Sequence, residues 1–165
     1  ALARRGVVEQ AVVYDPNRNE MFTASKGAGA FLNDRRIRVS KRVKLQDALV
    51  GTGFPYRQFR NVDTYLAIFK ELTQKTAGLR RPGAAALDLA YVAAGRFDGF
   101  FELNLKSWDI AAGELLVREA GGTVADARGG NDSLRNGQVL ACSMKLLKPL
   151  MQTVLPHWKG ILGQG

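Results

Sequence analysis

Asp109 is the residue of this sequence best suited to chemistry. It lies in the stretch WDIAAGELLVREAGG, residues 108–122, in which apolar residues recur at helical spacing before two glycines end the pattern. A carboxylate in the first turn of a helix lies near the positive end of the helix dipole, stays ionised and can hold a cation. An ordinary helix-capping aspartate has the same local pattern. The local sequence leaves both interpretations open.

Glu102 is a second acid, and it precedes Asp109 by a short loop. It belongs to segment 97–103, whose two-residue period predicts a strand with Asp98, Phe100 and Glu102 on one face. A strand that leads through a short loop into a helix brings both acids to one edge of a sheet, where α/β proteins bind ligands. We therefore expect the two carboxyls to share a site.

A run of small residues, PGAAA at 82–86, precedes an apolar helix that we expect to end at Gly95. Gly83 permits a close approach of the backbone, and the small residues after it leave the first helical N–H groups open to a ligand. Close packing of the chain is the alternative explanation. Arg80 or Arg81, just before the run, could add a cation. Metal-assisted hydrolysis of a phosphate ester needs more carboxylates than these, so the residues alone make half a site.

The composition excludes several other classes of protein. With 165 residues, 46% hydrophobic and 24% charged, the sequence fits a globular protein without a membrane span or signal peptide, and we expect it in the cytoplasm. The single cysteine, Cys142, lies in an apolar run and reads as buried. The single histidine, His157, follows a proline near the C-terminus, which makes a serine or cysteine nucleophile with a histidine base improbable.

The net charge of +9 favours attraction to phosphate, whether in a small ester or a nucleic acid. The densest basic run has no aromatic residue among its members, which are Arg35, Arg36, Arg38, Lys41, Arg42 and Lys44. Such a run is typical of a solvated face, and a polyanion-binding patch is the alternative.

Residues 1–45 have the pattern of an antiparallel meander, with alternating segments at 7–14 and 20–25 and a turn at 15–17 between them. Only three residues remain to pair with segment 7–14 on its other side. We therefore expect the sequence to begin inside a domain whose N-terminal part is missing.

Residues 46–165 alternate strands with helices, which predicts a mixed sheet of their own. We expect 1–45 to be the end of an N-terminal subdomain and 46–165 a C-terminal α/β subdomain. The first helix of the second part is expected to be capped by Asp63, with Leu66, Phe69 and Leu72 facing inward.

Three stretches together resemble the inositol monophosphatase family: WDIAAGELLVREAGG, GAAALDLAYVAAGRFDGFFE and VVYDPNRNEMFTASKGAGAFLN. The W-D-x-A-A-G motif is specific, and the resemblance covers nearly the whole sequence, as the C-terminal portion of a family member. It is closest to bacterial inositol-1-monophosphatases, one of which also serves as a ribosomal RNA transcription antitermination factor. Family members carry upstream a metal-binding glutamate and a D-P-x-D-G-T loop, and neither occurs in this sequence.

Carried over residue by residue, the resemblance implies that Asp109 is a catalytic metal ligand that also contacts substrate hydroxyls. Glu102 would accept a hydrogen bond from the inositol ring. The backbone of Gly83, Ala84 and Ala85 would hold ring hydroxyls. Some relatives have a threonine where this sequence has Ala84, so a hydroxyl contact is lost there.

Arg80 matches an arginine assigned to substrate binding in bacterial members, by way of the dimer or the rim of the site. The family also implies Mg²⁺, an activated water instead of a covalent intermediate, inhibition by Li⁺ and a homodimer. The implied fold is α/β, the layered α-β-α-β-α sandwich of the sugar phosphatase type. Since the remaining metal ligands are absent from this sequence, we expect the fragment by itself to be inactive.

The first hypothesis for function is Mg²⁺-dependent hydrolysis of a phosphate monoester, myo-inositol monophosphate, to inositol and phosphate by an inositol-phosphate phosphatase. Another ester, such as a sugar bisphosphate or a nucleotide-derived 3′-phosphate, would fit the same fold. The alternative class is a protein that binds RNA or the transcription complex in ribosomal RNA antitermination, with incidental phosphatase activity. No membrane partner is expected.

Overall fold

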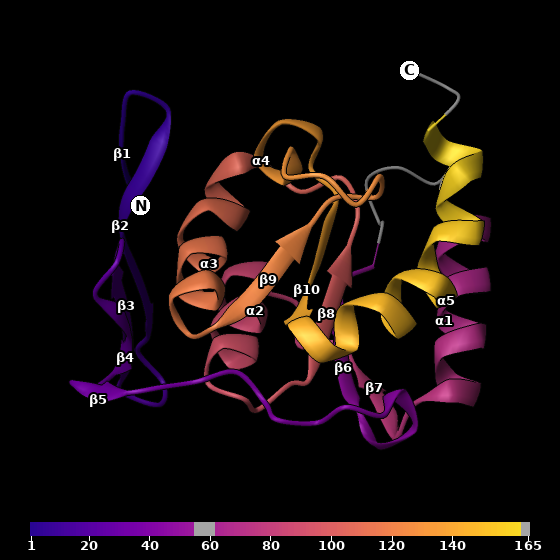
Figure 1. The fold of residues 1–165 in the computed structure, drawn as a ribbon, viewed down its shortest axis with the longest axis horizontal. Coiled ribbons are helices and arrows are strands. Elements are labelled where there is room, and N and C mark those ends of the chain that lie inside the picture. Colours follow the sequence, from indigo (N-terminus) through magenta and orange to yellow (C-terminus); the bar gives the residue numbers. More distant parts are fainter. Residues whose placement is uncertain (55–61, 163–165) are drawn as a thin grey trace.

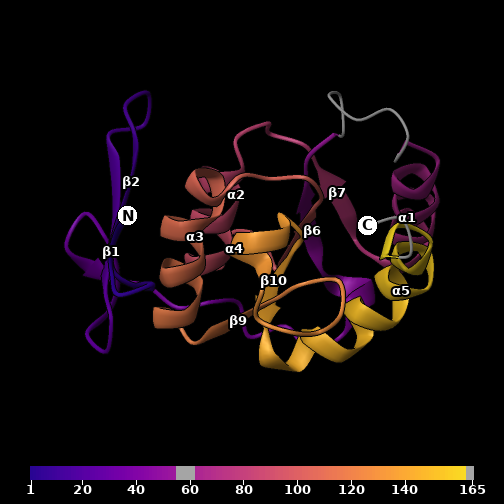
Figure 2. The same cartoon turned by 90° about the horizontal axis from the view of Figure 1, so that it is seen from above.

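The computed structural model describes the backbone of residues 1–54 and 62–162. It contains two five-stranded sheets with helices between them and on one outer side (Figure 1). Viewed from above, the described chain forms four layers in the order sheet, helices, sheet, helices (Figure 2). The chain therefore has the mixed α/β class that was expected, with four consecutive layers of the α-β-α-β-α order.

The first sheet is an antiparallel meander in chain order, as predicted. Its strands are β1 (Leu2–Arg4), β2 (Val7–Asp15), β3 (Glu20–Ser25), β4 (Gly29–Leu32) and β5 (Arg35–Arg36). Asn33 and Asp34, between β4 and β5, both have positive φ, which is the backbone of a two-residue hairpin turn. The two-residue period of β2 places Ala11 and Val13 on the helix side, while Val12 stays 57% exposed.

The second sheet is mixed, with the strand order β7-β6-β8-β10-β9. Its strands are β6 (Leu49–Thr52), β7 (Gly78–Arg80), β8 (Gly99–Glu102), β9 (Gly122–Ala125) and β10 (Val139–Ser143). β6 runs parallel to β7 and β8, whereas β10 is antiparallel to β8 and β9. The mixed sheet confirms the prediction for this part of the chain. The proline expected to end β6, Pro55, lies outside the described residues.

The helices are η1 (Leu45–Asp47), α1 (Val62–Lys75), α2 (Ala85–Ala93), α3 (Ser107–Glu119), α4 (Ser133–Asn136) and α5 (Met144–Leu162). α2 and α3 pack against each other between the two sheets, and α1 and α5 cover the far face of the second sheet (Figures 1 and 2). The segment from 108 to 119 is helical as predicted, with an ion pair of 2.8 Å between Arg118 and Glu114 on its outer side. No helix in the described part of the chain is long and apolar enough to cross a membrane.

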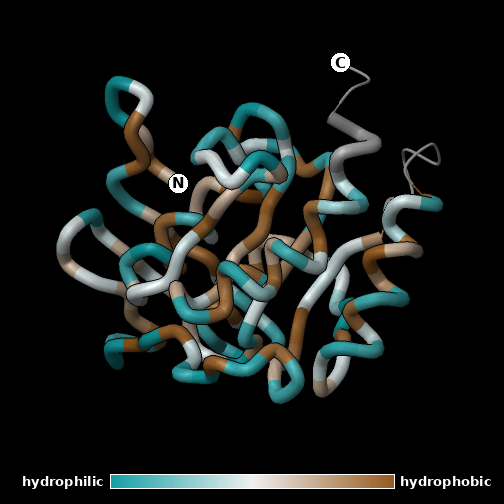
Figure 3. Tube along the Cα trace, turned by 45° about the vertical axis from the view of Figure 1, so that its right-hand side comes forward, coloured by the Kyte–Doolittle hydropathy of each residue, from teal (hydrophilic) through white to brown (hydrophobic). Residues whose placement is uncertain are grey.

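Two apolar clusters hold these layers together. One lies between the sheets and includes Phe22 of β3, Leu89 of α2 and Phe100 of β8. The other joins the far face of the second sheet to the outer helices and includes Phe101 of β8 and Trp158 of α5. Hydrophobic residues accordingly concentrate in the central strands, while the peripheral turns are mostly hydrophilic (Figure 3). Alternate residues of β8 thus face opposite helix layers.

The predicted inward face of α1 is correct for Leu72, which is buried, and wrong for Leu66 and Phe69. Leu66 and Phe69 are 48% and 36% exposed, whereas Tyr65 and Ile68 are buried against the second sheet. The ring of Tyr65 stacks on that of Phe101, which fixes the rotation of the helix about its axis. Asp63 lies in the first turn of α1, which begins at Val62, and the preceding residue lies outside the described residues.

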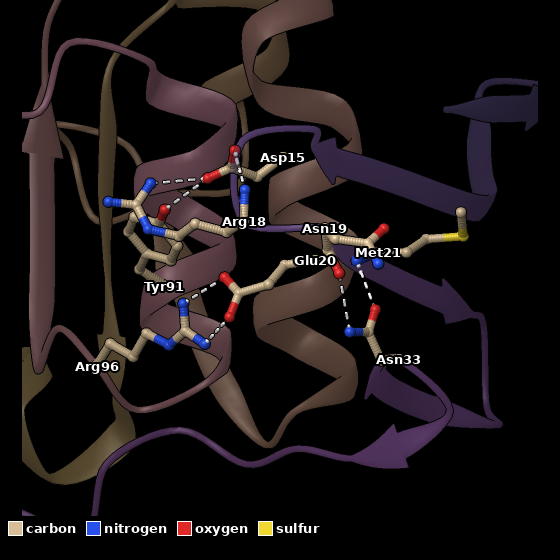
Figure 4. Close-up of polar contacts among 8 residues, drawn as sticks. All are labelled: Asp15, Arg18, Asn19, Glu20, Met21, Asn33, Tyr91 and Arg96. Atoms are coloured by element: carbon tan, nitrogen blue, oxygen red, sulfur yellow. Dashed lines mark hydrogen bonds and ion pairs between the residues drawn. The ribbon is translucent and has the colours of Figure 1, made fainter.

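Hydrogen bonds and ion pairs connect the first sheet to α2 and to the residues just after it (Figure 4). Arg18 Nη1 and the hydroxyl of Tyr91 donate to Asp15 Oδ2 at 2.9 and 3.3 Å. Arg96, just after α2, forms a bidentate pair with Glu20 at 2.6 and 2.7 Å. The sheet and the helices thus share polar contacts as well as an apolar cluster, and the division at residue 45 stays a prediction.

Candidate functional site

Glu102 is the last residue of β8, the central strand of the second sheet, and it lies on the face that is covered by α2 and α3. Phe100, two residues earlier, belongs to the cluster on that side, and Phe101 to the cluster on the other. On the neighbouring β6 side, a Cβ at Gly53 would lie 2.0 Å from Glu102 Oε1. The carboxyl therefore occupies the space that any side chain at Gly53 would fill.

Asp88 lies in α2 and is fully buried. Neither of its carboxyl oxygens has a hydrogen-bond partner among the described residues. Burial raises the pKa of Asp88 to about 7, against the opposing charge of Arg81. This aspartate is therefore a buried acid that the described fold leaves without a donor.

Asp109 is the third residue of α3 and lies beyond the loop that follows β8. Its Oδ2 accepts a hydrogen bond of 2.9 Å from the backbone N–H of Lys106, the residue before the helix. This contact stabilises the start of the helix, as in the capping interpretation. Within the described residues, no hydrogen bond engages Oδ1, so one oxygen is available to a ligand. The two interpretations of Asp109 are therefore compatible.

The loop between β8 and α3 is held against the segment that follows α4. The N–H of Leu105 donates to the carbonyl of Gly137 at 3.0 Å. A Cβ at Gly137 would lie 2.3 Å from the Leu105 carbonyl oxygen, and its φ of 70° is left-handed. This close approach holds in place the loop that joins Glu102 to Asp109.

The charges of Asp88, Asp109 and Arg81 all act on Glu102, and we call the three acids the carboxyl cluster. Burial first, and then the charges of Asp88 and Asp109, raise the pKa of Glu102 to about 7, while the charge of Arg81 opposes this rise. Arg81 is exposed, and its Nη1 would lie 3.3 Å from a Cβ at Gly83. Shifted carboxyls that converge on one strand edge are typical of a functional site.

The start of α2 forms the adjoining wall of this region. Gly83 has a φ of 101°, and Ala84 precedes the helix without a side-chain cap. The N–H groups of the first turn, which begins at Ala85, therefore have no side-chain acceptor at Ala84 and are open to a ligand. This is the open helix start that the sequence predicts.

Arg80 faces another hollow. A concavity of about 480 Å³ on the side toward the first sheet is lined by Arg80 and Ala84 together with Arg18, Tyr91 and Arg96. Among the predicted site residues, Arg80 thus lines this hollow, whereas the charge of Asp109 acts on Glu102, as does that of Arg81. Ala84 connects the two regions, because it lines this hollow and also precedes α2.

Sequence reasoning missed Asp88 and Gly53. The signal for Asp88 was a single acid within the otherwise apolar run ALDLAYVA, since a charge on a buried helix face needs a partner. The role of Gly53 had no local signal, because it depends on which side chain lies beside it in the neighbouring strand.

The other singled-out residues lie away from the cluster. Cys142 is a free, buried cysteine whose pKa is raised by burial to about 12, as expected of an inert thiol. His157 Nε2 lies 2.5 Å from Glu71 Oε2, where α5 meets α1. In the basic run, the guanidinium of Arg36 stacks over Phe31, and Arg42 pairs with Asp98 at 3.4 Å. These two arginines therefore have structural contacts and are not purely solvated.

The described residues do not form a metal site by themselves. Among them, no group of three histidine, cysteine, aspartate or glutamate side chains is arranged to hold a metal ion. Asp109 can supply one carboxylate oxygen at a helix start, which suits a cation but does not enclose one.

Comparison with known proteins places this geometry in context. The sequence model of the inositol monophosphatase family matches residues 1–158. The chain is 56% identical over 155 residues to the Nus factor SuhB of Pseudomonas aeruginosa, covering 93% of this chain and 57% of that protein. It is 49% identical over 154 residues to an inositol-1-monophosphatase of Rhizobium meliloti, covering 93% of this chain and 58% of that protein.

A solved structure has the same fold. The crystal structure of the extragenic suppressor protein suhB from Bartonella henselae superimposes with a TM-score of 0.88 at 47% identity, covering 91% of this chain and 57% of that one. The chain therefore spans less than two thirds of the length of these relatives. That share agrees with the expectation that it resembles one portion of such a protein.

Proposed function

The chain belongs to the inositol monophosphatase family, and on that premise we propose that it forms the substrate-binding side of a Mg²⁺-dependent phosphomonoesterase acting on myo-inositol monophosphate. The observation that carries the proposal is that Glu102 ends β8 and Asp109 lies in the first turn of the next helix, α3, while α2 begins without a side-chain cap. The inositol-1-monophosphatase name of the Rhizobium relative supports the choice of ester.

In this proposal the chain's own groups bind and orient the ester. Glu102 accepts a hydrogen bond from a ring hydroxyl, and the backbone at Gly83, Ala84 and Ala85 donates to neighbouring hydroxyls. Arg80 borders the adjoining hollow and would contribute at the rim. The helix start adds positive potential that favours an anionic ligand.

Asp109 would supply one carboxylate ligand to Mg²⁺, and the other ligands would come from outside the described residues. When bound, such a metal activates water and stabilises the leaving oxygen. Because Asp109 would supply only one of the ligands that the metal needs, we expect the chain alone to be inactive. Inhibition by Li⁺, a homodimer and a cytoplasmic location remain predictions on the same footing.

The test is Asp109→Asn in the complete polypeptide. We expect turnover of inositol monophosphate in Mg²⁺ to fall by a factor of about 100 to 1,000, since one oxygen of the charged ligand is replaced by an amide. The melting temperature should change little, because the amide oxygen can still accept from the Lys106 N–H. Near-normal hydrolysis would contradict the assignment. A panel of other phosphate monoesters, assayed alongside, decides the substrate.

A second candidate function is binding to RNA or to the transcription complex. The name of the Pseudomonas relative, Nus factor SuhB, supports this candidate. A shallow groove of about 800 Å³ runs between the linker after β5 and the end of α2. Arg38, Lys41, Arg42 and Arg96 line it, with Asp47 and Asp98 the acids among the lining residues. An excess of cations along an open groove suits a polyanion.

Neutralising Arg38, Lys41 and Arg42, which all line the groove, should weaken binding to ribosomal leader RNA and reduce the dependence of affinity on salt. The same binding should survive Asp109→Asn. Neutralising three exposed cations elsewhere, Lys70, Lys145 and Arg5, is the matched control and should leave more of the affinity intact. Equal losses from both sets would show a general charge effect and argue against a specific groove.

A further inference from the structure

The hollow beside Ala84, on the side toward the first sheet, has a lining whose charges all have one sign. Its volume is about 480 Å³. Small-molecule sites commonly have volumes of about 300 to 1,000 Å³. Among the described residues, the lining contains three arginines, Arg18, Arg80 and Arg96, and no acid. Three guanidinium groups around one concavity favour an anionic ligand.

The three arginines come from different elements. Arg18 lies in the turn between β2 and β3, Arg80 ends β7, and Arg96 follows α2. Each guanidinium has five N–H donors. Among the described contacts, Arg18 uses one of them for Asp15 Oδ2 at 2.9 Å, and Arg80 uses one for the carbonyl of its neighbour Leu79. Most donors of these two side chains are therefore available to a ligand, and guanidinium groups suit phosphate oxygens.

Arg96 is held in place by contacts within the fold. Its two Nη atoms donate to Glu20 at 2.6 and 2.7 Å, and its Cζ lies 5.2 Å from the centre of the Tyr91 ring. The Tyr91 hydroxyl donates to Asp15, which is also the partner of Arg18, so the two arginines flank this ring (Figure 4). Groups that are already fixed lose less conformational entropy when a ligand binds.

The rest of the wall is apolar. Pro82, Leu87 and Phe97 line it, and the Phe97 ring meets the Tyr91 ring edge-on, with 5.7 Å between the ring centres. Apart from the arginines, the polar side-chain group of the lining is the Tyr91 hydroxyl, which already donates to Asp15. A polyol ring would therefore find few partners for its hydroxyls here, whereas an apolar body needs none.

We propose that this hollow is a second ligand site, which binds a small organic phosphate or phosphonate with an apolar body. The arginines hold the anionic group, and the apolar wall packs against the body. The hollow is distinct from the candidate active site, because neither Glu102 nor Asp109 lines it; Arg80 and Ala84 belong to both regions. The proposal goes beyond the phosphatase function and does not depend on it.

The first experiment measures the binding of phenylphosphonate, which a phosphatase cannot hydrolyse, to the complete polypeptide by calorimetry without Mg²⁺. We expect phenylphosphonate to bind about tenfold more tightly than methylphosphonate, because only the phenyl ring can pack on the apolar wall. Inositol monophosphate should not displace it. Equal affinities for the two phosphonates, or displacement by inositol monophosphate, would overturn the proposal.

The second experiment locates the site with single variants. Arg80→Gln and Arg18→Gln should each weaken phenylphosphonate binding about tenfold, since each removes a charged donor from the lining. Arg4→Gln is the matched control, because Arg4 also pairs with an acid, Glu9, but lies on the β1–β2 hairpin. Arg4→Gln and Glu102→Gln should bind as the wild type does. A loss in Arg4→Gln equal to that in Arg80→Gln would show a general charge effect, and a loss in Glu102→Gln would place the probe in the candidate active site; either result overturns the proposal.

The third experiment detects the contact directly, by NMR of the complete polypeptide with ¹³C-labelled leucine methyl groups. The ring protons of phenylphosphonate should show nuclear Overhauser effects to the methyl groups of Leu87, whose resonances the variant Leu87→Ile assigns. The same effects should weaken in Arg80→Gln at equal probe concentration. Binding without any effect at Leu87 would mean that the ring lies elsewhere and would overturn the proposal.

Discussion

Asp88 and Asp126 are both buried in the described structure, but only Asp126 has the partners that a buried charge needs. Asp126 follows β9 in the loop that leads to α4. Burial by itself would raise its pKa, but the N–H groups of Gly130, Arg128 and Asp132 and the Asn136 amide hold it below its usual value. Asp88, at the edge of the carboxyl cluster, has none of these donors, and its pKa rises.

The difference separates two uses of the same residue type. The Asp126 carboxylate orders the loop that follows β9. It accepts four hydrogen bonds of 2.8 to 3.3 Å from residues of that loop and of α4. The Asp88 carboxyl accepts no hydrogen bond from the described residues, and its charge is one cause of the raised pKa of Glu102. A buried acid with donors therefore marks a structural element, and one without donors marks a place where function has been favoured over stability.

The largest effect that this comparison predicts is the loss of stability in Asp126→Ala. The change leaves four donors unpaired in and around a loop, and hydrogen bonds to a charged acceptor are the stronger class. We expect the free energy of unfolding, measured by urea denaturation, to fall by about 3 kcal/mol. Asp88→Ala is the control, and an equal loss in both variants would remove the distinction between the two aspartates.

The same variant should also change the acid dependence of stability. The folded-state pKa of Asp126 lies below its unfolded value of about 3.9, so its contribution is fully present above that value and is lost as the pH falls through the folded pKa. The gap in stability between wild type and Asp126→Ala should therefore be widest near neutral pH and narrow below about pH 4. A gap that is constant with pH would mean that the charge of Asp126 has no part in the loop.

A smaller effect is expected from Gly53→Ala, which perturbs the other region. The added methyl would meet the Glu102 carboxyl at 2.0 Å, so the glutamate must move. We expect KM for inositol monophosphate to rise about tenfold, with a modest change in melting temperature, because a side chain at the edge of the site can swing away.

Gly78→Ala is the control for that change, since it lies on the adjacent strand β7. A Cβ there would meet the end of the flexible Arg80 side chain at 3.4 Å, which is an ordinary contact. Its KM should match the wild type. A normal KM in Gly53→Ala would mean that Glu102 is not confined as the geometry indicates. The contrast between the two regions would then depend on Asp88 alone.

Most of the fold could be predicted from the sequence, because its signals are local. The alternation in β2 and β3 and the apolar stripe of α3 appear in the structure as expected. The inward face of α1 was predicted correctly only at Leu72, because apolar residues lie on two neighbouring faces of this helix. The stacking of Tyr65 on Phe101 selects one of them.

The candidate site divides in the same way. The sequence by itself determined Asp109 and Glu102 and their approach to one sheet edge, because a strand, a short loop and a helix have few possible arrangements. Only the tertiary structure decided that Glu102 lies against Gly53 and that Asp88 is buried without a hydrogen-bond donor. It also decided that the charge of Arg81 acts on Glu102, while Arg80 lines another hollow. The reason is physical: periodicity along the chain fixes which face a residue occupies, but burial, vacant space and missing donors depend on the neighbouring elements that pack there.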